Sequence, residues 1–154
     1  MRWIVLPLIV ALASTGCGPS EEDIAAEEAA RQAAVEDSLM AAAEAAFDAS
    51  VFDTLTWESQ EKRLARGEQV YNFSCSRCHG PEGLGDTGFV RGGDTLRPPS
   101  FREPTWALAG DIDAVRRAIY VGTKEGMPHW GLEGLHAEAA DAAALYILEG
   151  LGSS

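Results

Sequence analysis

The sequence predicts an all-helical domain over residues 60–154, preceded by an export signal and an acidic segment. Apolar residues recur at spacings of three and four in three stretches of this domain, as they do on one face of a helix. A segment rich in Gly and Pro, without periodicity, separates the first of these stretches from the second. No stretch of the domain alternates as a strand does, and 154 residues suffice for one compact domain with an extension.

Residues 1–16 are typical of a signal peptide. Arg2 supplies a positive charge, and residues 3–13 form an apolar run well short of the roughly 20 residues that span a bilayer. The segment Ser14-Thr15-Gly16-Cys17 resembles a bacterial lipobox, in which cleavage precedes a lipidated cysteine, although Leu is usual where Ser14 stands. We expect lipidation of Cys17 and anchoring to a membrane on its periplasmic side. The alternative is an ordinary cleaved signal with an incidental cysteine.

Residues 17–59 are rich in Ala, Glu and Asp, and predict a tether. From Glu21 to Glu58 there are eleven acidic residues and one base, whereas the whole chain has a net charge of −12. Large apolar side chains are too sparse here to build a core, so we expect a solvated helix or a partly disordered segment. The alternative is docking to a membrane complex or a basic partner through Phe47, Phe52 and Trp57. Such an acidic chain has no electrostatic footprint for nucleic acid.

The first helical stretch of the domain ends in Cys75-Ser76-Arg77-Cys78-His79. In a helix, Cys75 and Cys78 lie one turn apart, so their thiols point the same way. That separation suits two thioether bonds to haem vinyl groups, and His79 can then reach the iron from the same side. Because C-x-x-C-H is the spacing of c-type haem attachment, we expect one covalently bound haem c with His79 as an iron ligand.

Three other roles for the two thiols fit the sequence less well. A zinc site needs four ligands, and the spacing of His129 and His136 matches no zinc-finger pattern. A thioredoxin-like dithiol belongs to alternating strands and helices, which the sequence does not predict. A disulfide over so short a loop would be strained.

Met127 is the candidate for the second axial position of the iron. The other two methionines lie in the signal and the tether. A thioether ligand favours ferrous iron and raises the reduction potential relative to two imidazoles. His129 stays an alternative ligand because it lies only two residues further on, and a structural methionine in the core is the other alternative.

Two further helices are predicted at Asp111–Val121 and Glu138–Leu151. In the first, Asp111 or Gly110 can cap the start and Gly122 ends the pattern. His136 is expected at the surface, near the start of the last helix. The segment Gly80–Pro104 lacks periodicity, and a loop of that length usually wraps something, here the haem.

The chain from about Ala65 to Gly150 resembles the class I cytochrome c family. Gly67, Tyr71 and Cys75 have the spacing of that family's first helix, in which the glycine lets the last helix cross closely. Tyr146 resembles the aromatic partner on the last helix. The run Gly126-Met127-Pro128 resembles the axial-methionine loop.

The resemblance implies a class I cytochrome c fold, with three main helices around one covalent haem and with His79 and Met127 as axial ligands. It also implies that the carbonyl of Pro98 or Pro99 accepts a hydrogen bond from Nδ1 of His79, which would orient the ring and tune its basicity. Candidates for contacting the haem propionates are Trp106, Arg97 and Trp130.

The function expected from these features is the transfer of single electrons between respiratory-type protein partners. We expect it to take place in the periplasm, with the protein anchored to the membrane by a lipid. Two protein ligands leave the iron no open position, so we expect neither enzymatic activity nor a small-molecule substrate. One alternative is a haem c subunit of a larger oxidoreductase. Another is a haem sensor or ligand binder, which requires Met127 to dissociate.

Overall fold

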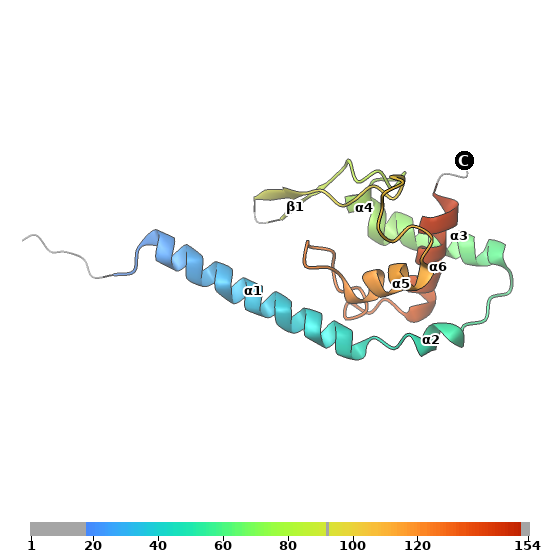
Figure 1. Ribbon diagram of the computed structural model, residues 1–154, viewed down its shortest axis with the longest axis horizontal. Coiled ribbons are helices and arrows are strands. Elements are labelled where there is room, and N and C mark those ends of the chain that lie inside the picture. Colours follow the sequence, from blue (N-terminus) through green and yellow to red (C-terminus); the bar gives the residue numbers. More distant parts are fainter. Residues whose placement is uncertain (1–17, 92, 152–154) are drawn as a thin grey trace, which may run out of the picture. The chain divides into compact units, whose positions relative to one another are not determined.

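The computed structural model describes residues 18–91 and 93–151, without the side chain of Arg91. The predicted signal peptide, residues 1–16, and Cys17 lie outside the described residues. The chain forms two compact units, residues 1–34 and residues 35–154. Figure 1 shows the succession of helices and the short hairpin.

Helix α1 (Glu21–Ala46) begins at a reciprocal cap. The amide of Asp23 donates to Oγ of Ser20 at 3.1 Å, and the amide of Ser20 donates to Oδ2 of Asp23 at 3.1 Å. This arrangement satisfies amides that have no partner within the helix. Residues 21–34, which belong to the first unit, are exposed throughout. The prediction of a solvated helix therefore holds for this part of the acidic segment.

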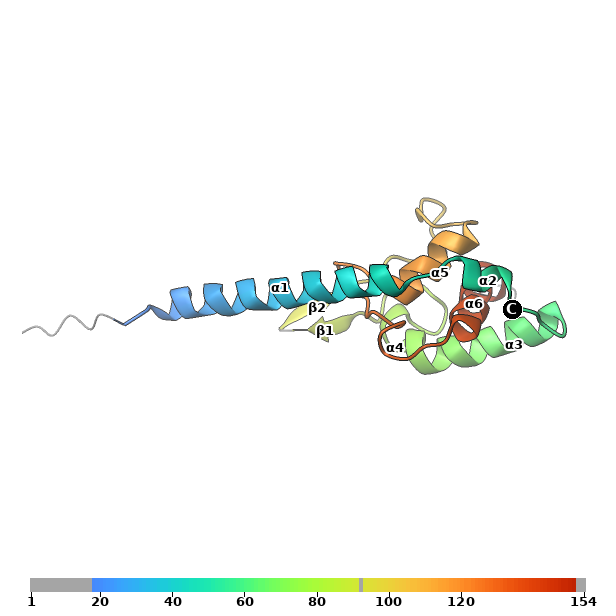
Figure 2. The same cartoon turned by 90° about the horizontal axis from the view of Figure 1, so that it is seen from below.

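The second unit includes residues 35–59, which the sequence places in the tether. Helix α2 (Ser50–Asp53) buries Phe52, and Phe47 and Leu55 pack against the same core. Figure 2 shows α2 beside α6 (Ala137–Leu145). These apolar side chains are too few to form a core alone, but each packs against helices from later in the chain. Phe47 and Phe52, predicted as possible docking residues, thus serve the protein's own core.

The predicted helices of the domain are present. Ser59 caps α3 (Gln60–Val70) by accepting from the amide of Lys62 at 3.2 Å, and Asp111 caps α5 (Ile112–Val121) by accepting from Ala114 at 2.9 Å. A π-helical turn, η1 (Tyr71–Cys75), joins α3 to α4 (Ser76–His79), and a second, η2 (Tyr146–Gly150), ends α6. The all-α fold class is confirmed.

Helices α3 and α6 cross at Gly67. A Cβ atom at this position would lie 2.1 Å from the carbonyl oxygen of Ala142 and 2.7 Å from Cβ of Tyr146. One turn further along, the rings of Tyr71 and Tyr146 lie 5.6 Å apart between centroids. The predicted close contact between the first and last helices is confirmed, because only glycine leaves room for it.

A short antiparallel hairpin interrupts the segment that was predicted to be a loop. Strand β1 (Phe89–Arg91) pairs with β2 (Asp94–Leu96), with Phe89 opposite Leu96. Strands of three residues are too short to show a recognisable alternation in the sequence. Since these are the only strands among the described residues, the hairpin does not change the fold class.

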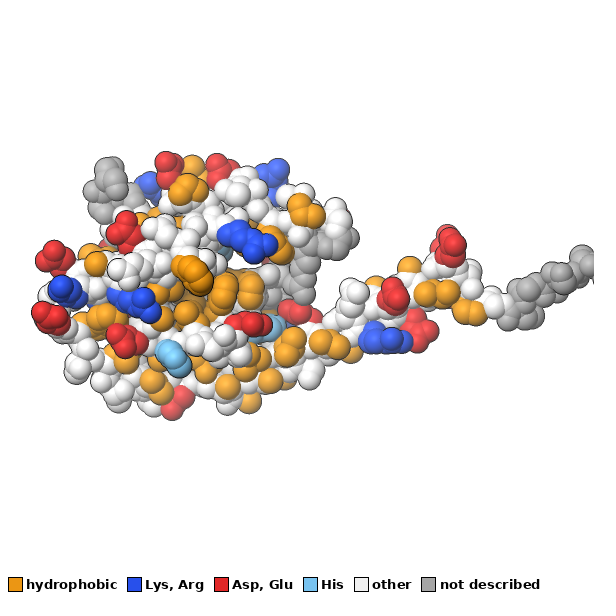
Figure 3. All heavy atoms as spheres, turned by 180° about the vertical axis from the view of Figure 1, so that it is seen from behind, with side chains coloured by type: hydrophobic (Ala, Val, Ile, Leu, Met, Phe, Trp, Pro, Cys, Tyr) orange, Lys and Arg blue, Asp and Glu red, His pale blue; other side chains and the backbone are white. Residues whose placement is uncertain are grey.

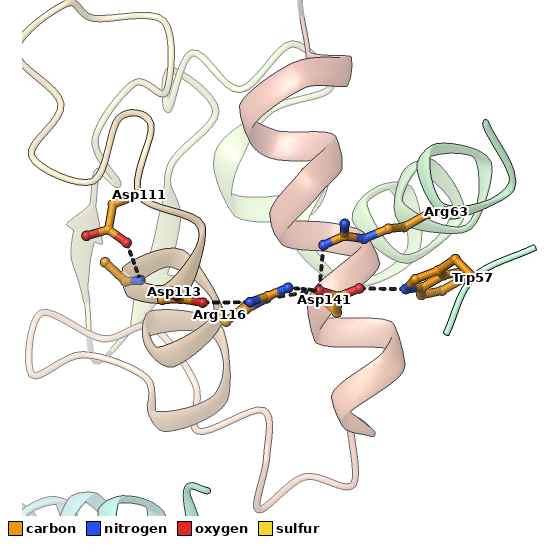
Figure 4. A network of polar contacts seen from close by, with 7 residues as sticks. Trp57, Arg63, Asp111, Asp113, Arg116 and Asp141 are labelled. Atoms are coloured by element: carbon orange, nitrogen blue, oxygen red, sulfur yellow. Dashed lines mark hydrogen bonds and ion pairs between the residues drawn. The ribbon is translucent and has the colours of Figure 1, made fainter. Parts of the chain in front are cut away.

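A buried carboxylate joins helices α3, α5 and α6 (Figure 4). The side chain of Asp141 on α6 is 2 % exposed, and its Oδ1 accepts from Nη2 of Arg63 at 2.6 Å and from Nε of Arg116 at 2.9 Å. Arg116 also pairs with the exposed Asp113. Two guanidinium groups therefore neutralise one buried acid, which is the condition under which a charge is tolerated in a core.

Candidate haem site

The second unit contains a cavity of about 440 Å³ bounded by the ends of η1 and α4, the hairpin, α5 and η2. Its walls are mainly apolar, and include Val115, Ile119 and Ile147. The structure brings the candidate site residues to this one cavity: Cys75, Cys78, His79, Pro98, Pro99 and Met127. The candidate propionate contacts Arg97, Trp106 and Trp130 line it as well.

Cys75 and Cys78 lie on the turn where η1 passes into α4, and both are free cysteines. Cys75 is buried and Cys78 is half-buried. Burial, together with the smaller effect of the neighbouring Cys78, raises the pKa of Cys75 to about 12. Burial therefore disfavours the thiolate form of Cys75, which argues against a reactive redox pair.

His79 closes α4 and lies against the cavity with 8 % of its surface exposed. Its ring stacks on Phe101, with centroids 4.5 Å apart and planes inclined by 21°. Burial lowers the pKa of His79 to about 4, because the charged form is poorly solvated there. The imidazole is thus neutral at physiological pH, which is the form that binds metals.

One ring nitrogen of His79, Nδ1, is placed to donate a hydrogen bond to a further group. Nδ1 of His79 is buried and has no hydrogen-bond partner within residues 18–91 and 93–151. Pro98 and Pro99 both line the cavity, and the carbonyl of Pro98 approaches Gly85 so closely that a Cβ there would lie 2.2 Å from it. The hydrogen bond from His79 to one of these proline carbonyls stays a prediction.

The backbone around His79 is fixed from two sides. The hydroxyl of Tyr71 donates to the carbonyl of Gly80 at 2.6 Å, and the amide of Gly85 donates to the carbonyl of His79 at 2.9 Å. Phe101, which stacks on His79, and Gly85, which bonds its carbonyl, could not be identified as site residues from the sequence. Both lie in the aperiodic segment, where no pattern distinguishes a contact residue from any other loop residue.

Met127 lies in the loop between α5 and α6 and is half-buried at the cavity. The amide of Thr123 donates to the carbonyl of Met127 at 3.2 Å, and the amide of Gly126 donates to Thr123 at 3.1 Å. Gly126 has φ +111, a conformation that a side chain would strain. The loop therefore makes a tight turn immediately before the methionine.

His129, the alternative ligand, does not line the cavity. Nδ1 donates to the carbonyl of Val121 at 2.5 Å, and Nε2 lies 3.2 Å from Oε1 of Glu36, an ion-pair distance without hydrogen-bond geometry. Both ring nitrogens thus have other neighbours, which disfavours His129 as an iron ligand. His136 is exposed at the start of α6, as predicted.

The cavity fits haem c in its chemistry. Two thiols one turn apart, a neutral buried imidazole and a thioether face a space with mainly apolar walls. A zinc site has no support, since the described part of the chain holds no cluster of three His, Cys, Asp or Glu side chains.

Fold and cavity together define a c-type cytochrome domain. Residues 62–147 match the model of the family described as "Cytochrome C oxidase, cbb3-type, subunit III", and the chain belongs to this family. Membership implies covalently bound haem c and a role in electron transfer.

A curated relative is also a cbb3-type oxidase subunit. The "Cbb3-type cytochrome c oxidase subunit CcoP" of Azospirillum sp. (strain B510) is 28 % identical over 68 residues, which are 44 % of this chain and 22 % of that protein. The chain therefore covers less than a quarter of the relative's length. The search of solved structures gave no significant match. Among residues 18–91 and 93–151, no helix is both long and apolar enough to cross a membrane.

Proposed function

We propose that this protein is a monohaem cytochrome that carries single electrons between protein redox partners on the periplasmic side of a membrane. The observation that supports this proposal best is the convergence of Cys75, Cys78, His79 and Met127 on one apolar-walled cavity. Haem supplies the one-electron iron couple when it is bound.

The residues of the chain would hold the group and set its environment. Cys75 and Cys78 would form the two thioether bonds, and His79 and Met127 would be the axial ligands. Burial keeps His79 neutral and therefore able to bind iron, and Phe101 restrains the tilt of its ring. With both axial positions filled, the iron would have no site for a substrate, which supports electron transfer rather than catalysis.

Export and lipidation belong to the proposal as well. We propose that residues 1–16 are a signal peptide and that Cys17 carries lipid, which would anchor the chain to a membrane. Residues 17–34 then form the tether, since residues 35–59 belong to the compact unit. A tether supports electron transfer to membrane partners because it raises their effective concentration.

The second candidate is a haem c subunit held permanently in an oxidase complex. The family description and the name of the Azospirillum relative favour it. On the face shown in Figure 3, acidic and basic side chains are interspersed around hydrophobic ones. Mild solubilisation of membranes separates the candidates: a carrier is recovered as a monodisperse single chain, and a subunit co-purifies in fixed ratio with larger chains.

Mass spectrometry and optical spectroscopy of the mature protein test the haem assignment. The expected mass includes one haem attached covalently, and the oxidised spectrum shows the methionine–iron charge-transfer band at neutral pH. Cys75→Ser/Cys78→Ser removes the haem mass, while Cys17→Ser removes only the lipid mass. A mature wild-type chain without covalent haem would contradict the proposed function. A missing charge-transfer band would contradict Met127 as a ligand and favour a haem sensor.

A further inference from the structure

The second half of α1 contacts the loop that carries Met127. Oε1 of Glu36 lies 3.2 Å from Nε2 of His129, and Oδ1 of Asp37 accepts from Nζ of Lys124 at 2.9 Å. Lys124 precedes Met127 by three residues and His129 follows it by two. The acidic helix therefore contacts the loop on both sides of the methionine.

The C-terminal end of α1 and the residue that follows it contact helix α5. Ala43 is fully buried, and the ring of Phe47 lies 5.5 Å from that of Tyr120 between centroids. Glu44 also pairs with Arg117 of α5. All these residues belong to the second unit. These contacts anchor the end of the helix that carries Glu36 and Asp37.

The loop needs support from its surroundings. Gly122 has φ +82 and Gly126 has φ +111, and glycine loses more conformational freedom on ordering than any other residue. Met127 would have to keep a fixed position for its sulfur to remain bound to iron. Contacts that restrict Lys124 and His129 also restrict the short stretch between them.

We propose that Glu36 and Asp37 are positioning residues that brace the Met127 loop and keep the methionine sulfur at the haem iron. This inference rests on the proposed function, in which Met127 is an axial ligand. It gives part of the acidic segment a role in the haem site, beyond that of a tether.

The two contacts differ in strength. The side chains of Asp37 and Lys124 are 66 % and 70 % exposed, and an ion pair in that environment contributes little. Those of Glu36 and His129 are 26 % and 8 % exposed, so this contact is better shielded from water. We therefore expect Glu36 to contribute most of the bracing.

The test compares three full-length haem-loaded proteins: wild type, Glu36→Gln/Asp37→Asn, and the control Glu22→Gln/Glu28→Gln. The control removes the same charge from the exposed part of the same helix. The methionine–iron charge-transfer band is followed through a urea titration of the oxidised protein. Hydrogen exchange of the amides of residues 122–130 is measured in native buffer.

We call Glu36→Gln/Asp37→Asn the brace variant. At urea concentrations below global unfolding, the fraction of its molecules that have lost the methionine–iron charge-transfer band is expected to be about five- to tenfold higher than in wild type. Exchange in residues 122–130 accelerates by a similar factor, while the far-ultraviolet helical signal in buffer is unchanged. The control matches wild type. Lys124→Gln weakens the same contact from the loop side, leaves α1 intact and is expected to give a smaller loss of the band.

The outcomes separate the two proposals. If wild type shows the band and the brace variant behaves as the control does, the proposed role of Glu36 and Asp37 is wrong. The proposal that Met127 is an iron ligand is then unaffected. If wild type itself lacks the band, Met127 is not the ligand and both proposals fail at that residue. Retention of the band in the charge swap Asp37→Lys/Lys124→Asp supports pairing of these two residues as the cause, and a loss of the band as large as that in Lys124→Gln argues against it.

Discussion

The indole Nε1 of Trp57 donates a hydrogen bond of 2.8 Å to Oδ2 of Asp141, across 84 residues of sequence. Because Oδ1 of the same carboxylate accepts from Arg63 and Arg116, both oxygens are satisfied in the interior (Figure 4). The bond joins the segment before α3 to the last helix. It is one physical reason why residues 35–59 belong to the second compact unit.

Asp141→Asn is expected to lower the free energy of unfolding by about 3 kcal/mol, because it removes the buried counter-charge that Arg63 and Arg116 share. Urea unfolding of the haem-loaded protein measures the change. Asp113→Asn is the control: it removes another partner of Arg116, but its carboxylate is 81 % exposed, so a change within about 0.5 kcal/mol is expected. Equal effects of both variants would contradict the importance of burial here.

Gly67→Ala is expected to separate α3 from α6. The added Cβ would lie 2.1 Å from a backbone oxygen of α6, which cannot rotate away, so the helices must shift. Overpacking of this kind costs about 1–3 kcal/mol or more, and thermal unfolding reports it. Ala65→Ser, at an exposed position on the same helix, should leave the melting temperature nearly unchanged. A tolerated alanine at position 67 would mean that the crossing is looser than described.

Met127→His is expected to lower the reduction potential by on the order of 0.1 V, since a second imidazole favours ferric iron relative to a thioether. Redox titration followed by absorption measures the potential, and the charge-transfer band disappears in the variant. Met40→Leu, in the acidic helix, leaves both unchanged. A potential that did not move in Met127→His would argue against Met127 as the ligand.

The haem-loaded protein is expected to keep its imidazole ligand down to about pH 4. Burial lowers the pKa of unligated His79 from 6.5 to about 4, and iron binding favours the neutral ring further. The folded-state pKa lies below that of the unfolded chain, so this group lowers stability as the pH falls from 6.5 towards 4. Absorption during acid titration follows the ligand, and its release above pH 5 in a chain that is still helical would contradict the buried environment.

Much of the protein was predictable because its determinants are local in sequence. The fold class, the cytochrome c family and haem c are confirmed, and they follow from helical periodicity and from the five residues Cys75 to His79. The contact of Gly67 with the last helix was also expected, because Gly67, Tyr71 and Cys75 resemble the first helix of class I cytochromes c. The ligand set, the lipidation of Cys17 and the hydrogen bond of Pro98 or Pro99 stay predictions.

What the sequence by itself determined is the class of the domain and its cofactor, since thiol spacing and apolar periodicity are properties of neighbouring residues. Only the tertiary structure decided where the compact unit begins, that Phe101 stacks on His79, and that Glu36 lies beside His129. Each of these depends on segments brought together by folding. A sparse set of apolar side chains such as Phe47 and Phe52 becomes part of a core only when another helix supplies the remaining surface, and no local pattern records that partner.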